Sequence, residues 1–239
     1  MAYKTTDSTD FNLDLNSIIE EAFERCGAEL RTGYDFRTAK RSLGLLLNSD
    51  WANRGFNLWT LEIKSHTLTY NVGTYDLDAD TVDLADHVIR TGTDTSQQDI
   101  NISRISSSTY LSIPNKNATG RPIQIWINRR SGATGADNVV VKPQFTVWPK
   151  PDNTTTWTLV YTRLRRMFDV GNGVNGQDIP FRFLECMIAG LAWKMSIKIA
   201  PDRTQILKEQ YNEAWDLAAG EDREKAPDRF VPRQSFLGE

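Results

Sequence analysis

The first 55 residues carry apolar side chains with the period of an α-helix. One apolar stripe begins at Leu15 and ends at Gly27, and a second extends from Phe36 to Trp51. Asp35 stands where its side chain could cap the second stripe. Because only a few residues separate the two stripes, the pattern predicts a pair of antiparallel helices.

Between residues 56 and 168 the apolar period shortens to that of β-strands. The segments RPIQIWINRR and TWTLVYTRL alternate most clearly, and DINISRIS alternates more weakly. VKPQFTVWPKP adds a strand, and its Pro149 and Pro151 favour an edge or a strand end. Gly, Asn and Pro separate these short segments, which predicts a sandwich or a small barrel. The run SSSTYLSIP predicts a single helical turn within this region.

Helical spacing returns towards the end of the chain. Two further stripes, within residues 184–195 and 207–218, are separated by Pro201. Asp202 and Gln205 have the spacing of a capping box at the start of the second stripe. The sequence therefore predicts two more helices, which can pack against the first pair.

These patterns predict an α+β fold. In the simplest architecture the N- and C-terminal helices form one helical bundle, and an antiparallel β-sandwich or barrel-like domain is inserted between them. The expected parts are an N-terminal helical hairpin at 1–55, a β domain at 56–168, a Gly-rich hinge at 169–179, C-terminal helices at 180–220 and an extended arm at 221–239.

The final segment is charged and contains proline, a composition typical of an extended arm. Aromatic and arginine side chains in such an arm suit folding onto a partner, where they would act as anchors. The residues expected to bind the neighbouring protein are Arg223, Arg229, Phe230, Val231, Arg233 and Phe236. A tail without any binding role is the alternative.

Three glycines before the last helices, Gly171, Gly173 and Gly176, have the G-x-G-x-x-G spacing of a dinucleotide-binding site. That site requires a helix N-terminus close to the glycines, whereas Asp178 and Pro180 delay the helix. No strand pattern follows the helix, so a βαβ unit cannot close. We therefore expect no nucleotide cofactor and interpret the glycines as a flexible hinge.

Net charge and cysteine content argue against several classes of binding site. The net charge of −3 does not suit a basic nucleic-acid-binding protein. Cys26 and Cys186 fall within apolar helical stripes, so we expect core packing instead of a disulfide or a zinc site. The first residues lack the apolar region of a secretory signal, and no apolar run has the length of a membrane span.

The acidic run YDLDADTVDLAD is similar to the start of a calcium loop, but Thr81 and His87 stand where that loop needs glycine and glutamate. A solvated acidic turn is the favoured interpretation. No nucleophile motif accompanies His66 or His87. Spacing selects no carboxylate pair for glycoside hydrolysis, although such a pair remains open. We expect no catalytic residue and no metal, and hence no enzyme.

Basic clusters end two of the predicted strands. They are Arg129 with Arg130, and Arg163 with Arg165 and Arg166. These arginines could contact DNA phosphates, but in an acidic protein ion pairs at the surface or between subunits are the favoured interpretation. Trp51, Trp193 and Trp215 lie in helical stripes and predict a helix core more than a ligand cage.

Longer runs follow one another in a characteristic order. They are SLGLLLNSDWANRGFNLWTLE, GTYDLDADTVDLADHVIR, ISRISSSTYLSIPNKNATGRPIQIWINRR, VWPKPDNTTTWTLVYTRLRR, DIPFRFLECMIAGLAWKMSIKIAPDR and EDREKAPDRFVP. Together they extend over nearly the whole chain, and their order and spacing resemble the head-to-tail adaptor family of short-tailed bacteriophages, also called connector or tail tubular proteins.

The resemblance implies a virion structural protein of the tail or neck, assembled in the host cytoplasm. Members of this family form a ring, typically of twelve subunits, beneath the portal protein dodecamer. A C-terminal extension grips the portal, the lower side receives the tail nozzle protein and often tail fibres, and double-stranded DNA passes through the lumen during ejection. An acidic wall would release that DNA instead of holding it.

Two other functions stay open at this point. The first is a virion hydrolase that cleaves peptidoglycan with a carboxylate pair. The second is a glycan-binding module built on the β region.

Overall fold

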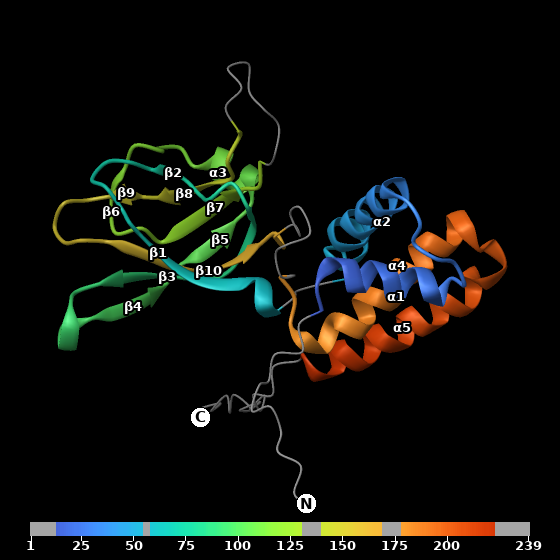
Figure 1. Cartoon of the computed structure of the whole chain (residues 1–239). Helices are drawn as coiled ribbons and strands as arrows, with labels where there is room; N and C mark the ends of the chain where they lie inside the picture. The colour runs from blue at the N-terminus through green and yellow to red at the C-terminus, as the bar shows by residue number, and fades with distance from the viewer. Residues whose placement is uncertain (1–12, 55–57, 131–139, 169–177, 223–239) are drawn as a thin grey trace, which may run out of the picture.

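The computed structural model describes residues 13–54, 58–130, 140–168 and 178–222. Helices occupy both ends of the described part of the chain and strands its middle, so the predicted α+β class is confirmed. Figure 1 shows the strands gathered on one side and α1, α2, α4 and α5 on the other.

Polar side chains start the first two helices. The carboxylate of Asp14 caps α1 (Leu15–Arg25) and accepts a backbone hydrogen bond of 2.9 Å from the first turn. α2 (Gly33–Leu45) begins with a capping box in which Thr32 is the N-cap and Asp35 bonds back from the first turn. The predicted cap at Asp35 is therefore displaced by one turn, because Thr32 is the residue with extended backbone.

α2 continues directly into a π-helical turn, Leu46–Trp51. The predicted stripe up to Trp51 is thus continuous, although its winding changes at Leu46. Short helical turns also introduce the last two helices. Phe181–Phe183 precedes α4 (Leu184–Ile199), and Pro201–Arg203 precedes α5 (Thr204–Glu221).

The start of α5 differs from the prediction. The proposed capping box of Asp202 and Gln205 does not form, because a 3-10 turn already holds the first backbone groups. Gln205 instead donates a hydrogen bond of 2.7 Å to Glu209, one turn further along α5.

The helices share one hydrophobic core, and α4 lies between α1, α2 and α5 (Figure 1). Gly190 marks a close approach of α4 to its neighbours in this core. A Cβ atom there would lie 2.8 Å from Leu46 Cδ2 and 2.9 Å from Tyr211 Cε2. Fully buried members of the core include Leu15, Ile18, Ile19, Leu46, Trp51, Cys186, Leu191 and Tyr211.

One sheet is entirely antiparallel. Its strands follow the order β1 (Leu61–Thr67), β10 (Thr158–Arg165), β3 (Thr81–Thr91) and β4 (Gln98–Asn101). β10 is therefore a central strand, and alternate residues along it are buried.

The second sheet follows the order β2 (Thr74–Asp76), β8 (Gln144–Trp148), β7 (Gln124–Asn128) and β5 (Ser103–Ile105). β5 pairs with β7 in parallel, which departs from the predicted antiparallel arrangement. The departure arises because β5 is followed by a crossover, α3 (Ser107–Ser112), which places the chain at the opposite end before β7 begins.

Two shorter strands, β6 (Thr119–Gly120) and β9 (Lys150–Pro151), also pair in parallel. α3 confirms the helical turn predicted from SSSTYLSIP. β8 ends at Trp148, directly before Pro149. Of the two predicted alternatives, Pro149 therefore follows the end of a strand, and that strand is central in its sheet, not at the edge.

The inward faces of the two sheets enclose a second hydrophobic core, separate from that of the helices. The two sheets stack on one another as in a sandwich (Figure 1). Residues of this core include Tyr75, Leu84, Ile89, Ile125, Phe145, Val147, Leu159 and Tyr161.

Candidate functional site between the strands and the helices

Two arginines continue the buried face of β10. Leu159 and Tyr161 point into the sandwich core, and Arg163 and Arg165 follow on the same face because strand residues alternate. The two arginines are 4% and 8% exposed. Buried charges of this kind require partners.

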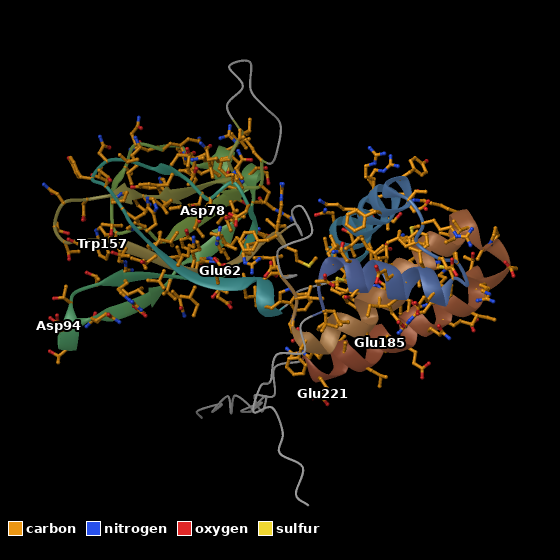
Figure 2. All side chains as sticks on the ribbon, viewed as in Figure 1. Glu62, Asp78, Asp94, Trp157, Glu185 and Glu221 are labelled. Carbon is orange, nitrogen blue, oxygen red and sulfur yellow. The ribbon has the colours of Figure 1, made fainter. Side chains whose placement is uncertain are left out.

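Arg163 is surrounded by carboxylates from other segments. Its Nη2 donates to Glu62 Oε2 at 2.8 Å, and its Nη1 donates to Asp80 Oδ1 at 2.7 Å. Asp78 Oδ2 lies 3.0 Å from Nη1, and the Thr81 hydroxyl accepts a further bond of 3.1 Å. Figure 2 labels Glu62 on β1, where the strands approach the helices.

Arg165 extends this cluster to the helical side. It donates to Glu62 Oε1 at 2.8 Å and binds the carboxylate of Asp178 through both terminal nitrogens, at 2.5 and 3.0 Å. Glu62 therefore bridges the two arginines, and Asp178 ties the cluster to the segment that leads into α4. We call Glu62, Asp78, Asp80, Arg163, Arg165 and Asp178 the arginine cluster.

The pKa values in the cluster favour the charged forms. Hydrogen bonding from Arg163 holds the pKa of Glu62 below its usual value of 4.5. Burial alone would lower the pKa of Arg163, but its bonds to Asp80 and Glu62 outweigh burial and raise it. The bond to Asp178 raises the pKa of Arg165. The ion pairs of Arg163 and Arg165 thus stabilise the charged forms of Glu62 and of both arginines.

This arrangement has limited chemical scope. Guanidinium groups that already bind carboxylates are poorly placed to bind a phosphate, and they do not act as bases near neutral pH. A general acid for glycoside hydrolysis needs a raised pKa, whereas that of Glu62 is lowered. The residues of the cluster are therefore suited to holding two parts of the chain together.

Asp178 also fixes the backbone where it returns from the strands. Its Oδ2 accepts a hydrogen bond of 2.9 Å from the backbone N–H of Phe168. The guanidinium of Arg165 lies 4.3 Å from the centroid of the Phe168 ring. The two ends of the segment predicted as a hinge are consequently joined to each other. Its glycines, Gly171, Gly173 and Gly176, lie outside the described residues.

A cavity of about 330 Å³ lies beside the cluster, between helices and strands. The π-helical turn contributes Leu47 and Asn48, and the end of β10 contributes Leu164 and Arg165. Of the described residues that line it, none is His, Cys, Asp or Glu. The cavity is therefore a gap in the packing between the two parts, and both apolar and polar side chains, arginines included, line it.

The acidic run predicted as a solvated turn is largely ion-paired. Asp78 bonds Lys64 at 2.6 Å as well as contacting Arg163. Asp83 bonds Arg104 at 2.9 Å and lies 3.6 Å from Arg129. Asp78 is both ion-paired and 51% exposed, as expected of a solvated face, whereas Asp83 is 20% exposed and departs from that prediction.

The arginines of the two predicted basic clusters are partly buried and partly exposed. Arg163 and Arg165 are buried ion pairs within the chain, neither surface pairs nor contacts between subunits, which corrects the favoured interpretation. Arg129, Arg130 and Arg166 remain exposed at the ends of their strands. Within the described part of the chain, no group of three or more His, Cys, Asp or Glu side chains could hold a metal ion.

The cysteines and histidines lie in packed surroundings. Cys26 and Cys186 are buried free thiols, and burial raises their pKa values to about 11 and about 12. At neutral pH they are thiols, which makes them poor nucleophiles. His66 packs edge-on against the rings of Tyr75 and Phe145, and burial lowers the pKa of His87.

Aromatic side chains gather where the chain passes from the helices to β1. The Trp51 ring lies 6.4 Å from Trp59, 5.6 Å from Phe183 and 5.3 Å from Trp215. Trp193 stacks on Tyr211 at 5.4 Å. The three tryptophans of the predicted helix core are thus packed against other helical side chains, and Trp59 joins them from the turn before β1.

Sequence reasoning missed Glu62 and Asp178 as members of the site. Each is one acidic residue among many, and no local pattern distinguishes them. The predicted arm residues lie outside the described residues; they are Arg223, Arg229, Phe230, Val231, Arg233 and Phe236. α5 reaches Glu221, and the following Asp222 is buried and ion-paired with Arg182, so any arm begins after it.

No known protein-family model matches the chain, and no curated protein sequence matches it. Among the described residues, none of the helices combines the length and the apolar character needed to cross a membrane.

Proposed function

We propose that this chain is a structural protein of a virus particle, a head-to-tail adaptor that forms a ring between portal and tail nozzle and conducts DNA during ejection. The proposal rests first on the resemblance of the runs quoted above to that family. The chain would then work through its surfaces, and its interior would serve to keep those surfaces in place.

The arginine cluster is the structural observation that carries the proposal. Its buried cations bind carboxylates from β1, from the turn between β2 and β3, and from the segment before α4. Such a network gives a fixed relation between the sandwich and the helices, which a subunit under load in a ring requires. Its ionised and mutually paired groups lack the proton donor that a hydrolase would need.

The terminal arm supplies the expected contact with the portal. Asp222 is 7% exposed and pairs with Arg182, so a chain that ends at residue 222 keeps the last helix and its ion pair intact. A truncation after residue 222 therefore retains every residue of α5 and the Asp222–Arg182 ion pair. Removal should abolish binding to the portal while the helices and strands stay folded.

The experiment mixes the purified chain with its portal dodecamer and images the product by electron microscopy, with the full chain and with a chain that ends at residue 222. A ring of density beneath the portal, lost upon truncation, is the expected result. Rings that form equally well without the arm would remove its proposed role. A full chain that never binds a portal, or that degrades peptidoglycan or binds glycans instead, would contradict the adaptor proposal.

A further inference from the structure

The outer side of α2 is a basic surface. Tyr34, Arg37, Lys40 and Arg41 line an open groove of about 630 Å³ on this helix. Tyr34 is 64% exposed, and both arginines are exposed as well. Among the described residues no carboxylate forms an ion pair with Arg37 or Arg41, and Arg41 reaches the Thr38 hydroxyl at 3.4 Å. We call these four residues the α2 basic face.

A second groove, of about 480 Å³, lies where α5 meets α1 and α4. Glu213 of α5 lines it, is exposed and forms no ion pair within the described part of the chain. Glu209 and Asp216 are two further exposed carboxylates of α5 without an ion pair among the described residues. The groove also contains an apolar side chain, Leu217, which is 71% exposed. The residues that line it are Arg25, Glu185, Gln210, Glu213, Ala214 and Leu217.

The cation within the second groove does not cancel this charge. Arg25 already bonds Glu21 at 2.9 Å and Glu185 at 2.7 Å. Two carboxylates thus neutralise one guanidinium, and the α5 carboxylates add further negative charge. We call this surface the α5 acidic groove.

The two surfaces cannot meet within one chain. Figure 1 shows α2 along one side of the helices and α5 along the other, with α1 and α4 between them. Each surface combines charge with one exposed large side chain, Tyr34 or Leu217. Exposed tyrosine and arginine side chains are enriched in protein interfaces, and complementary charge favours one partner surface over others.

We infer that a second copy of this chain occupies the α5 acidic groove with its α2 basic face. Such a contact is heterologous, since two different surfaces of the same chain meet, and its repetition generates a ring when the rotation closes. The inference adds to the proposed function the surfaces through which subunits meet. It rests on the proposed function only for the closure of the subunits into a ring. Because the contact is electrostatic in part, added salt should weaken it.

Crosslinking between two marked populations tests this pairing in the full chain. The native cysteines are buried, so an engineered surface cysteine is the reactive one. One population carries Thr38→Cys beside the α2 basic face, and the other carries Gln210→Cys in the α5 acidic groove; neither change alters a charge. A short bismaleimide should give mixed dimers severalfold in excess of either homodimer. The control pairs Thr38→Cys with Thr67→Cys on β1, which is exposed and far from both surfaces.

Charge reversal then tests the cause of the pairing. Arg37→Glu with Arg41→Glu in the first population should suppress the mixed dimer, and Glu209→Lys with Glu213→Lys in the second should restore it. The matched control reverses two exposed arginines elsewhere, Arg121→Glu with Arg130→Glu, and should change nothing. Circular dichroism of each variant confirms that the fold is retained.

The outcomes separate this inference from the proposed function. Homodimers in excess, mixed dimers no more abundant than the control, or failure of the paired reversal to restore them would each overturn the inference. Rings that form on the portal with the reversed variants would keep the adaptor proposal and reject these surfaces. Mixed dimers without any portal binding would keep the pairing of these surfaces and reject the adaptor proposal.

Discussion

Arg163 occupies a position that its neighbours along the strand mark for an apolar side chain. The alternation that predicts β10 places Leu159, Tyr161 and then Arg163 on one face. Continuing the two-residue period past Tyr161 would have predicted a buried arginine. Its partners could not have been predicted in this way, because Glu62 and Asp80 are brought to it by strand pairing and a turn.

Replacing this arginine should be costly. Arg163→Met removes a cation from between Glu62 and Asp80 and leaves their carboxylates beside each other. We expect a loss of about 2–3 kcal/mol in the free energy of unfolding, less than for a fully enclosed pair because the carboxylates are partly exposed.

Urea denaturation measures this loss, with Arg90→Met as the matched control. Arg90 pairs with Asp99 at 2.7 Å, but both side chains are more than a third exposed, 35% and 38%. Its replacement should cost far less than that of Arg163, because water and salt screen an exposed pair. Equal losses for the two variants would show that the burial of Arg163 has no energetic consequence.

Among the elements, the helices followed most directly from sequence. The apolar stripes located α1, α2 and α5 because each of these helices buries one face. They also located α4, which is buried on nearly all sides because it lies between the other three. The first residues of α2 and α5 were harder to predict from the sequence. The N-cap at Thr32 and the 3-10 turn at Pro201–Arg203 are set by backbone conformation, which the apolar pattern does not show. The parallel pairing of β5 with β7 depends on tertiary topology, which periodicity does not encode.

The packing of α4 against its neighbours makes a testable prediction at Gly190. In Gly190→Ala the new methyl group would collide with Leu46 and Tyr211, both fully buried. Repacking should cost about 1–3 kcal/mol, which outweighs the gain of up to about 1 kcal/mol in helix propensity.

Thermal and urea unfolding provide the measurement. The control is Gly44→Ala in α2, where a Cβ atom meets nothing within 4 Å. This control should be stabilised by up to about 1 kcal/mol. If Gly190→Ala were also stabilised, the close approach of α4 to α5 would be incorrect.

For the whole molecule, the chain passes twice between helices and strands, and each passage is fixed by side chains. Trp59 packs into the helix core just before β1, and Asp178 binds Arg165 just after β10. The sequence predicted the helices and the strands, and a flexible hinge at 169–179 whose glycines lie outside the described residues. The hydrogen bond from Phe168 to Asp178 could not be predicted from the sequence, because Asp178 is held in place by the whole arginine cluster.

Ionised carboxylates in both parts make stability depend on pH. Hydrogen bonds from arginines lower the pKa of Glu62 and of Glu185 below 4.5. The unfolded chain therefore takes up protons first as the pH falls, so the stabilisation present above pH 4.5 is lost as the pH falls through the folded pKa. Burial lowers the pKa of His87 below 6.5, which adds a smaller loss beginning at that pH.

The midpoint of urea unfolding, measured against pH, should decline gently below pH 6.5 and steeply below pH 4.5. His87→Gln should remove the gentle part, and Arg163→Met should reduce the steep part. Stability that increased on acidification would be incompatible with these shifts.

The tryptophans around Trp51 have an optical consequence. Trp59 and Trp215 hold their ring planes at 80° and 65° to Trp51, with centroids 6.4 and 5.3 Å away. Indole transitions this close and this inclined couple as excitons and produce a pair of bands of opposite sign in circular dichroism. Since Trp59 belongs to the turn that leads into β1 and Trp215 belongs to α5, detachment of the first strand would remove the Trp51–Trp59 part of the signal and leave the Trp51–Trp215 part.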